Sequence, residues 1–357
     1  MWVNGKQNPP WVPIKLQFKQ SNRRGNVKED RVSVLKIIKT CGKEKDLCKA
    51  RRVHADIVKK NLVITNDTYV ASALISAYAK CGALEKAQEV FEKLSVRDTI
   101  SWNALISAYG LKGLHEKSLD CFKQMQEENV NPNSVTYICI LKACAHVGSL
   151  SIVDDINVEV RKQGLLTKDV ALGNVLVDMY AKHGALKKAR EVFEELPIRN
   201  VVSWTTIITG YLQHGFEFEA LKCFKQMQDG GIQPDLLIYV CILKACGVVG
   251  SLEIGEDIYA KVSKRGLLKK DIVLGNTLVG MYSKCSALER AQEVFEQLPT
   301  RDIVSWNALI AGYAHLGQAN VVMDLYIKMR REDIRPNLIT FILLLNACSH
   351  AGLVMEG

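Results

Sequence analysis

Apolar residues recur at helical spacing along this 357-residue chain, from about residue 31 to its end. In the stretch 68–98, Leu74 and Tyr78 lie about one helical turn apart, and after a Cys-Gly turn a second apolar series begins at Leu84. Spacings of three and four residues place side chains on one face of an α-helix, whereas a strand would show strict alternation. The pattern therefore predicts pairs of helices joined by a turn, and it predicts no β-sheet.

The helical pairs repeat with a period of 102 residues: SWNALISAYG begins at residue 101, SWTTIITGYL at 203 and SWNALIAGYA at 305. Each period divides into units of 36, 31 and 35 residues, except that the first 36-residue unit has one extra residue. We place the units at 31–67, 68–98, 99–133, 134–169, 170–200, 201–235, 236–271, 272–302 and 303–337, with a partial unit at 338–357. One pair of short helices cannot bury its apolar face alone, but stacked pairs can. The sequence therefore predicts an all-α fold, a right-handed α-solenoid of stacked helix-turn-helix repeats.

Charge is unevenly distributed along the chain. The formal net charge is +9, and six of these charges come from residues 1–28, which contain no acidic residue. The remainder is close to balanced, so an interpretation as a nucleic-acid-binding protein cannot depend on bulk charge. Residues 1–30 form a basic leader that is typical of either an organelle transit peptide or a disordered segment. No apolar run reaches the ~18–20 residues that a membrane span needs, so no membrane association is predicted.

Ten of the eleven cysteines share registers across the periods, and none shows metal-ligand spacing. Cys144, Cys246 and Cys348 lie 102 residues apart, and Cys41 occupies the matching place in the first period. Matching places in a stack of helical pairs should lie tens of ångströms apart, beyond the reach of a disulfide. No C-x-x-C motif occurs, which argues against zinc. The cysteines are therefore predicted to be small core residues, and neither a metal site nor a cofactor is predicted.

Units of 31, 35 and 36 residues in rotation make the chain similar to the PLS class of pentatricopeptide repeat (PPR) proteins. The stretches that carry the resemblance are VVSWTTIITGYLQHGFEFEALKCFKQMQDGGIQPD, VALGNVLVDMYAKHGALKKAREVFEELPIRN and YICILKACAHVGSL, and it covers residues 31–357. The tetratricopeptide repeat, at a uniform length of about 34 residues, fits these lengths less well. The resemblance implies sequence-specific binding of single-stranded RNA, with one base per repeat, in mitochondria or chloroplasts.

In this family two residues of each repeat contact a base: the fifth residue, on the first helix, and the last residue of the repeat, here called the closing residue. The resemblance carries these roles to small polar residues in the 31- and 35-residue units. The pairs are Ser72 with Asp98, Asn103 with Asn133, Asn174 with Asn200, Thr205 with Asp235, Asn276 with Asp302, and Asn307 with Asn337. The alternative interpretation, that Asn and Asp only cap helices, accounts for the closing residues but not for a polar residue inside a helix.

Hydrogen-bonding chemistry suggests which base each pair prefers. Asp only accepts, which suits the imino N–H of guanine or uracil, whereas the Asn amide can donate to the bare ring nitrogen of adenine or cytosine. A small Ser or Thr leaves room for a purine, and a longer Asn favours a pyrimidine. The 36-residue units have apolar fifth residues, such as Ile138 and Val240, and are assigned no base. With the 5′ end at the N-terminal repeats, as in the family, the expected RNA is 5′-G-Y-n-Y-G-n-U-Y-3′, where Y is a pyrimidine and n is unassigned.

Three lysines share a register near the end of the first helix of the 31-residue units: Lys80, Lys182 and Lys284. One such lysine would be ordinary on a solvated helix face. In the family a lysine at this place faces the RNA backbone, so the resemblance implies phosphate contacts for all three.

The sequence contains no P-loop, no H-E-x-x-H motif and no H-x-E with a following C-x-x-C, so the chain is not expected to be an enzyme. The function favoured by the resemblance is a specificity factor in organellar RNA processing, above all C-to-U RNA editing. Two alternatives stay open: a protein-binding solenoid scaffold of the tetratricopeptide kind, and an RNA-editing deaminase whose catalytic domain lies beyond residue 357. Because the partial unit 338–357 has only a first-helix pattern, we expect the chain to be a fragment. An editing deaminase or an accessory protein is then a further expected partner.

Overall fold

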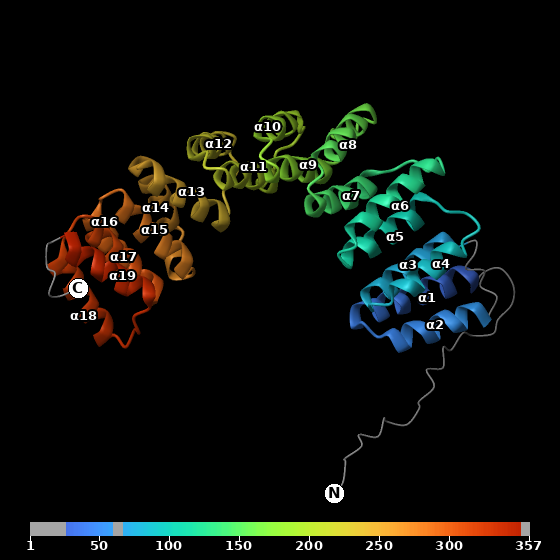
Figure 1. Ribbon diagram of the computed structural model, residues 1–357, viewed down its shortest axis with the longest axis horizontal. Coiled ribbons are helices and arrows are strands. Elements are labelled where there is room, and N and C mark those ends of the chain that lie inside the picture. The colour runs from blue at the N-terminus through green and yellow to red at the C-terminus, as the bar shows by residue number, and fades with distance from the viewer. Residues whose placement is uncertain (1–25, 60–66, 351–357) are drawn as a thin grey trace, which may run out of the picture. The chain divides into compact units, whose positions relative to one another are not determined.

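The computed structural model describes residues 26–59 and 67–350, and every regular element in these ranges is a helix. Figure 1 shows a succession of short helices joined by tight turns. The chain divides into two compact units, Met1–Val147 and Gly148–Gly357. The all-α solenoid of helical pairs that the sequence predicts is confirmed within each of them.

The first compact unit consists, in its described residues, of seven helices. These are α1 (Asn26–Glu44), α2 (Leu47–Lys59), α3 (Thr68–Lys80), α4 (Leu84–Glu92), α5 (Thr99–Leu111), α6 (His115–Glu127) and α7 (Ser134–Val147). Helix α1 packs on α2, α3 on α4, and α5 on α6, so each of these pairs is a helical hairpin. The first helices of successive repeats, α1, α3, α5 and α7, also pack side by side.

The second compact unit continues the pattern. Its elements are α8 (Leu150–Lys162), α9 (Val170–Lys182), α10 (Leu186–Glu195), α11 (Val201–Gln213), α12 (Glu217–Asp229), α13 (Leu236–Val249), α14 (Leu252–Lys264), the 3₁₀ turn η1 (Leu267–Lys269), α15 (Ile272–Lys284), α16 (Leu288–Gln297), α17 (Ile303–His315), α18 (Ala319–Arg331) and α19 (Leu338–His350). Five hairpins follow α8, namely α9–α10, α11–α12, α13–α14, α15–α16 and α17–α18. Helices α9, α11, α13, α15, α17 and α19 pack side by side.

In both compact units the helices form two layers. A second helix contacts the first helix of its own pair and the first helix of the next pair, as α10 contacts α9 and α11. Such stacking buries apolar faces that one hairpin would leave in water. It covers one side of the first-helix layer and leaves the opposite side uncovered, so polar residues on that side can meet a ligand.

The tryptophan of the repeated Ser-Trp motif anchors each 35-residue unit to the unit before it. Trp204 in α11 is 6% exposed and meets Phe193 of α10 in an edge contact, with ring centroids 4.8 Å apart. The same contact joins Phe91 to Trp102 and Phe295 to Trp306. Edge-to-face pairs stabilise by about 0.5–1.5 kcal/mol beyond the burial of their area. The repetition of the motif in the sequence thus corresponds to a repeated packing contact between units.

A glycine forms the turn between the two helices of each 35-residue unit. Gly113, between α5 and α6, has φ 72°, which lies in the left-handed region. Gly215 and Gly317 adopt the same conformation, with φ 74° and 68°. A side chain is strained there, whereas glycine has no Cβ and adopts the conformation freely. Any other residue at these places would therefore destabilise the hairpin.

Both ends of the chain reach beyond the described residues. The predicted leader, residues 1–30, lies outside them as far as residue 25, and α1 begins at Asn26. Helix α19 is the first helix of the partial unit, whose residues 351–357 also lie outside the described ranges. Within those ranges, no helix is long and apolar enough to cross a membrane.

The cysteines are mostly core residues, as predicted, but not all of them are. Cys144 and Cys246 are buried, and burial raises the pKa of their thiols to about 11 and about 12. Cys48, on α2, is exposed, so the core interpretation is wrong for this residue. It shares no register with another cysteine, and the periodicity therefore carried no information about it. The described residues contain no group of three or more His, Cys, Asp or Glu side chains that could hold a metal ion.

Candidate nucleic-acid interface

The six closing residues each lie directly before a first helix and cap its N-terminus. Asp235, for example, accepts a hydrogen bond through Oδ1 from the backbone N–H of Ile238, at 2.9 Å. The corresponding bonds run from the N–H of Ser101 to Asp98, Thr136 to Asn133, Ser203 to Asn200, Ser305 to Asp302, and Thr340 to Asn337. The capping interpretation is therefore correct for all six, and caps of this kind stabilise a helix by about 0.5–2 kcal/mol.

Capping occupies only one of the two terminal atoms on these side chains. All four hydrogen bonds to the Asp302 carboxylate end on Oδ1, so Oδ2 has no partner among the described residues. The same holds for Asp235, where Oδ1 alone is occupied. In Asn133, Asn200 and Asn337 the occupied atom is again Oδ1, and Nδ2 has no partner in the described ranges. An Asp closing residue thus presents an acceptor, and an Asn closing residue presents a donor.

Three of the six fifth residues are hydrogen-bonded directly to their closing residue. The bonds run from Nδ2 of Asn103 to Asn133 at 3.1 Å, from Asn276 to Asp302 at 3.0 Å, and from Asn307 to Asn337 at 3.2 Å. Each of these fifth residues is 8–9% exposed, so its amide has little freedom to turn. The structure therefore brings together three of the predicted pairs as rigid two-residue groups.

A buried hydroxyl that was not predicted from the sequence fixes these amides. It belongs to the third residue of the following unit, and Thr136, Ser305 and Thr340 are all 0% exposed. Thr136 Oγ1 donates to Asn103 Oδ1 at 2.7 Å. The backbone N–H of Thr136 meets Asn133 Oδ1, so that atom is an acceptor and Asn103 must turn its donor toward it. The signal in the sequence is a Ser or Thr three residues after the closing residue.

The remaining pairs are not bridged in this way within the described residues. The hydroxyl of Ser72 donates to the carbonyl of Thr68, and the hydroxyl of Thr205 donates to the carbonyl of Val201 at 2.7 Å. Both bonds stay within one helix, so neither hydroxyl reaches across to its closing residue. Asn174 differs again, because its Oδ1 is buried and has no hydrogen-bond partner in the described part of the chain.

Asp98 and Asp302 stay ionised at neutral pH. Burial alone would raise the pKa of Asp302, but hydrogen bonds from the Ser305 backbone, the Ser305 hydroxyl and the Asn276 amide outweigh burial and lower the pKa. The pKa of Asp98 is lowered in the same way, since the backbone N–H of Ser101 and other donors outweigh burial there. An ionised carboxylate only accepts hydrogen bonds. Both closing residues are therefore acceptors, as the predicted preference for guanine or uracil requires.

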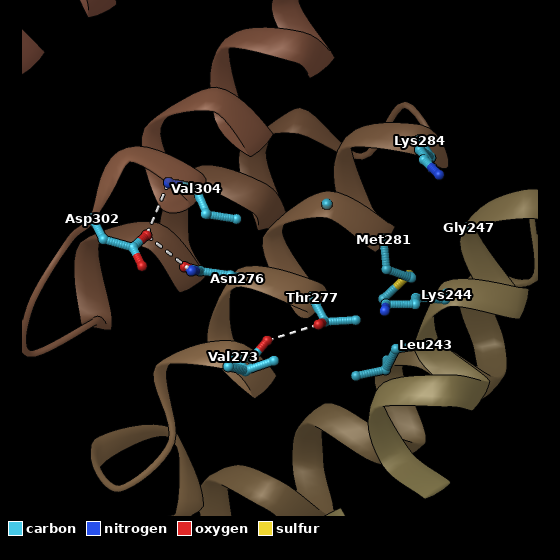
Figure 2. Close-up of a pocket in the computed structure, with 11 residues that line it drawn as sticks. Leu243, Lys244, Gly247, Val273, Asn276, Thr277, Met281, Lys284, Asp302 and Val304 are labelled. Carbon is cyan, nitrogen blue, oxygen red and sulfur yellow. Dashed lines mark hydrogen bonds between the residues drawn. The ribbon is translucent and has the colours of Figure 1, made fainter. Parts of the chain in front are cut away.

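Two cavities lie at matching junctions, where a 36-residue unit meets the 31-residue unit that follows. The larger, of about 430 Å³, lies between α13, α15 and the start of α17 (Figure 2). Its lining includes Asn276, Asp302, Val273, Val304, Lys244 and Lys284. The smaller, of about 400 Å³, lies between α1 and α3, and its lining includes Ser72, Tyr69, Lys39 and Lys80 at the matching places. The cavity is thus a repeated feature, and a predicted base-contacting residue lines each copy.

The second residue of almost every unit is apolar yet exposed, a feature not predicted from the sequence. Val273 and Val304 are 57% and 54% exposed and border the larger cavity. The others are Val32, Tyr69, Ile100, Val135, Val202, Leu237 and Ile339. A regular series of apolar side chains at the surface, beside polar groups and a cavity, is typical of a binding surface. The signal in the sequence is an apolar residue three places before the fifth residue.

The three predicted backbone lysines, Lys80, Lys182 and Lys284, are the exposed last residues of α3, α9 and α15. They differ in their partners. Lys182 Nζ donates to Asp178 Oδ2 at 2.7 Å in an ion pair. Lys80 and Lys284 line the two cavities and form no ion pair with a described residue. An anion would therefore meet uncompensated charge at Lys80 and Lys284 and a partly neutralised lysine at Lys182.

Two family models match the chain at regular intervals. The PPR repeat family model matches residues 97–146, 199–248 and 301–350, and the PPR repeat model matches residues 69–98, 174–201 and 276–303. Together these matches span more than half of the chain.

Curated relatives are found among plant proteins. One pentatricopeptide repeat-containing protein of Arabidopsis thaliana is 35% identical over 329 residues, which is 92% of this chain and 40% of the relative. Another, named chloroplastic, is 34% identical over 316 residues, 88% of this chain and 51% of its own length. A third, named mitochondrial, is 34% identical over 292 residues, 82% of this chain and 48% of its own length. The chain thus spans about half the length of the curated relatives it matches.

The fold is similar to that of a solved structure. Maize PPR10, a pentatricopeptide repeat protein crystallised in complex with an 18-nt psaJ RNA element, aligns with a TM-score of 0.62 at 19% identity. The alignment covers 85% of this chain and 45% of PPR10. At this level of identity the likeness concerns the fold alone.

Proposed function

Because the chain belongs to the pentatricopeptide repeat family, we propose that it binds single-stranded RNA and that each 31- or 35-residue unit recognises one base. The solved relative PPR10 was crystallised with an RNA element, and this chain is similar to it in fold. The proposed partner is RNA of the sequence 5′-G-Y-n-Y-G-n-U-Y-3′.

The observation that carries the proposal is the hydrogen-bonded group made by a fifth residue and a closing residue. In the group of Asn276 and Asp302, Oδ1 of the carboxylate caps α17 and accepts from the amide, while Oδ2 is unoccupied by any described residue. A uracil imino N–H would donate to that oxygen. In the group of Asn103 and Asn133, the unoccupied Nδ2 of Asn133 would donate to the bare ring nitrogen of cytosine.

The fifth residue would select between purine and pyrimidine by size. Asn103, Asn276 and Asn307 extend to their closing residues, and these longer side chains would favour the smaller pyrimidine ring. Ser72 and Thr205 bond to their own helices and leave the space beside Asp98 or Asp235 unbridged, which suits a purine. The proposed guanines fall on these two units.

Two further features would hold the strand in place. Exposed apolar second residues such as Val273 and Val304 would contact the faces of a base whose edge meets Asn276 and Asp302. Contacts to base faces tolerate any base, so selection would remain with the polar pair. Lys80 and Lys284 would contact phosphates, and Lys182 would contribute less because it is paired with Asp178.

The cellular role that we propose is that of a PLS-class specificity factor in organellar RNA processing, with C-to-U editing as the leading process. The rotation of 31-, 35- and 36-residue units supports the class. The names of relatives, chloroplastic in one case and mitochondrial in another, support an organellar location in a mitochondrion or chloroplast. A deaminase, supplied by another protein or by sequence outside this chain, would perform the chemistry.

The proposed function is tested by a binding titration with three RNAs: a single strand of the proposed sequence, a single strand of the same composition in shuffled order, and a duplex of the proposed sequence. The proposed strand should bind at least tenfold more tightly than the shuffled one, because each mismatched base contact costs on the order of 1–3 kcal/mol by analogy with base contacts in DNA. The duplex should bind weakly, since its base edges are already paired. Equal affinity for all three RNAs would show that binding is electrostatic and nonspecific, which would contradict the proposed function.

A further inference from the structure

The first helix of each 36-residue unit carries a lysine at the ninth place of the unit. These lysines are Lys39, Lys142 and Lys244, and all three are exposed. The matching residues are Ser76, Asp178 and Gly280 in the 31-residue units, and Ser107, Thr209 and Ala311 in the 35-residue units. A basic residue at this place is therefore confined to the units whose fifth residue is apolar.

In two of the three copies this lysine lines a cavity together with the lysine that ends the next first helix. Lys39 and Lys80 line the smaller cavity, and no carboxylate is found among the described residues that line it. Lys244, from α13, and Lys284, from α15, line the larger cavity (Figure 2). The carboxylate of Asp302 also lines the larger cavity, where it is held by α17 and by Asn276. Each cavity thus has at least two cationic groups from two different units.

A glycine allows the second lysine to lie against the helix that carries the first. A Cβ added to Gly247 would lie 3.2 Å from Cδ of Lys284, and a Cβ added to Gly42 would lie 3.3 Å from Cδ of Lys80. Only a residue without a side chain accommodates these stems without movement. Gly247 lies three residues after Lys244, on the same face of α13. Because the stem of Lys284, from α15, lies next to Gly247, both lysines of the larger cavity are at this face.

The ninth-place lysines have no acidic partner within the described residues. Other exposed lysines do form ion pairs, as Lys188 does with Asp154 at 2.8 Å. Neighbouring lysines without counter-charges repel one another, and an anion bound between them removes that repulsion. The arrangement is therefore suited to a ligand that carries regularly spaced negative charges.

We propose that the 36-residue units hold the RNA backbone without recognising a base, and that Lys39, Lys142 and Lys244 each contact a phosphate of the bound strand. This inference rests on the proposed RNA binding. The 36-residue units, to which no base is assigned, then add affinity for RNA and accept any base. A lysine ammonium is a compact donor that binds phosphate at many angles, which suits a contact that must not select.

An acidic peptide is the other polyanion that such lysines would attract. RNA is favoured because the same two cavities are lined by Ser72, or by Asn276 and Asp302, whose polar atoms complement base edges rather than carboxylates. The half-buried carboxylate of Asp302, which lines the larger cavity, would repel the carboxylates of an acidic peptide that lay along this surface.

The test compares three forms of the whole chain in salt titrations of RNA binding: the wild type, the triple variant Lys39→Gln, Lys142→Gln, Lys244→Gln, and a charge-matched control. The control replaces Lys123, Lys187 and Lys225 with Gln; these lysines are exposed, lie on the second helices α6, α10 and α12, and form no ion pair with a described residue. Single-stranded RNA gives a slope of about −0.7 per phosphate contact. The salt slope of the test variant should be about two units shallower than that of the wild type. Between ~50 mM and ~200 mM salt, the affinity of the variant for RNA should therefore fall by a factor roughly 20-fold smaller than that of the wild type.

The test variant should lose the same amount of salt slope with RNAs that differ at the two unassigned bases. The control variant should keep the wild-type slope. An unchanged slope in the test variant, or an equal loss in the control, would overturn the inference, because bulk charge would then explain the binding. Loss of binding to a polyglutamate peptide, with RNA binding intact, would overturn it in favour of a protein partner. If the wild type bound no single-stranded RNA at all, the proposed function itself would fail, and the two failures are thus distinguishable.

Discussion

Asp302 illustrates how a single residue serves the fold and the proposed site together. Its Oδ1 accepts from two backbone N–H groups, a hydroxyl and an amide, while its Oδ2 has no partner among the described residues. A substitution of Asp by Asn at such a place keeps the cap, since both residues cap helices well. It changes the other atom from an acceptor to a donor. In the proposed function, base preference and helix stability would therefore vary independently at the closing residues.

Thr136 provides a test at the same scale, because its hydroxyl bonds to both members of the pair Asn103 and Asn133. Thr136→Val keeps the shape and removes the hydroxyl, which leaves Asn103 Oδ1 buried without a partner and destabilises the protein by about 1–3 kcal/mol. The preference of unit 99–133 for a pyrimidine should fall toward none, because the Asn103 amide is no longer fixed. The measurement is a pair of titrations with RNAs that differ at that base, alongside thermal unfolding.

Thr136→Ser is the matched control, since it keeps the hydroxyl and removes only a methyl group. It should retain the pyrimidine preference. Full preference in Thr136→Val, or an equal loss in Thr136→Ser, would mean that the hydroxyl does not position the Asn103 amide and that packing alone matters there.

The resemblance to the family indicates that the fifth and the closing residue of a unit contact a base, and the repeat in the sequence then fixes their residue numbers. Neither indicates the third-residue hydroxyl, because Thr136 and Asn103 are 33 residues apart and meet only when α5 and α7 pack. The ion pair of Asp178 and Lys182 could have been predicted from the sequence, because residues four apart on a helix are neighbours.

At the scale of helices, each 35-residue unit is joined to the one before it by a Phe and a Trp. Trp204 of α11 packs against Phe193 of α10, and its indole Nε1 is buried with no hydrogen-bond partner among the described residues. The ring therefore contributes through packing rather than through its N–H group. Lys80, Lys182 and Lys284 are the last residues of α3, α9 and α15, so they lie at the ends of these first helices, as the sequence predicts.

Replacement of Trp204 should separate these two contributions. Trp204→Ala should destabilise α10 and α11 by about 3–5 kcal/mol, as large-to-small changes of buried aromatic residues do. Trp204→Phe should cost much less, because it keeps an aromatic ring and removes an N–H that has no partner. Hydrogen exchange of the amides in α10 and α11 measures both. Equal loss of protection in the two variants would show that the whole indole, rather than an aromatic ring of any size, is needed at this contact.

Along the whole chain, we propose that the 31- and 35-residue units recognise bases and that the 36-residue units hold the RNA backbone. The order of units along the chain was predictable, because a repeat of 102 residues is visible in the sequence. The cavities and the exposed second residues could not be predicted from the sequence, because exposure depends on which side of the first-helix layer the second helices cover.

The lysines that end the first helices of the 31-residue units should act on affinity for every RNA alike. Replacement of Lys80 and Lys284 with Gln should flatten the salt dependence by about 1.4 units, at about 0.7 per contact. Replacement of Lys182 alone should have a smaller effect, because Asp178 already compensates its charge. Salt titrations of the double and the single variant measure the difference. A change that depended on RNA sequence, or an equal effect per lysine, would contradict the structural assignment.

Asp235→Asn decides whether one pair of residues recognises one base. Asp235 caps α13 through Oδ1 and presents its other oxygen, so the variant should fold as well as the wild type and present a donor instead. The measurement is a titration of both proteins against two RNAs that differ only at the second guanine, which is replaced by adenine in one of them. Asp229→Asn, at the exposed end of α12, controls for the lost charge.

We expect Asp235→Asn to lose affinity for guanine and to gain affinity for adenine at that base alone. The swing should be about 1–3 kcal/mol, or roughly ten- to a hundredfold, by analogy with paired base contacts in DNA. Asp229→Asn should keep the preference for guanine. If Asp235→Asn, shown to be folded, kept the wild-type preference at that base, the pair of Thr205 and Asp235 would not recognise RNA, and the assignment of bases to the other pairs would fall with it.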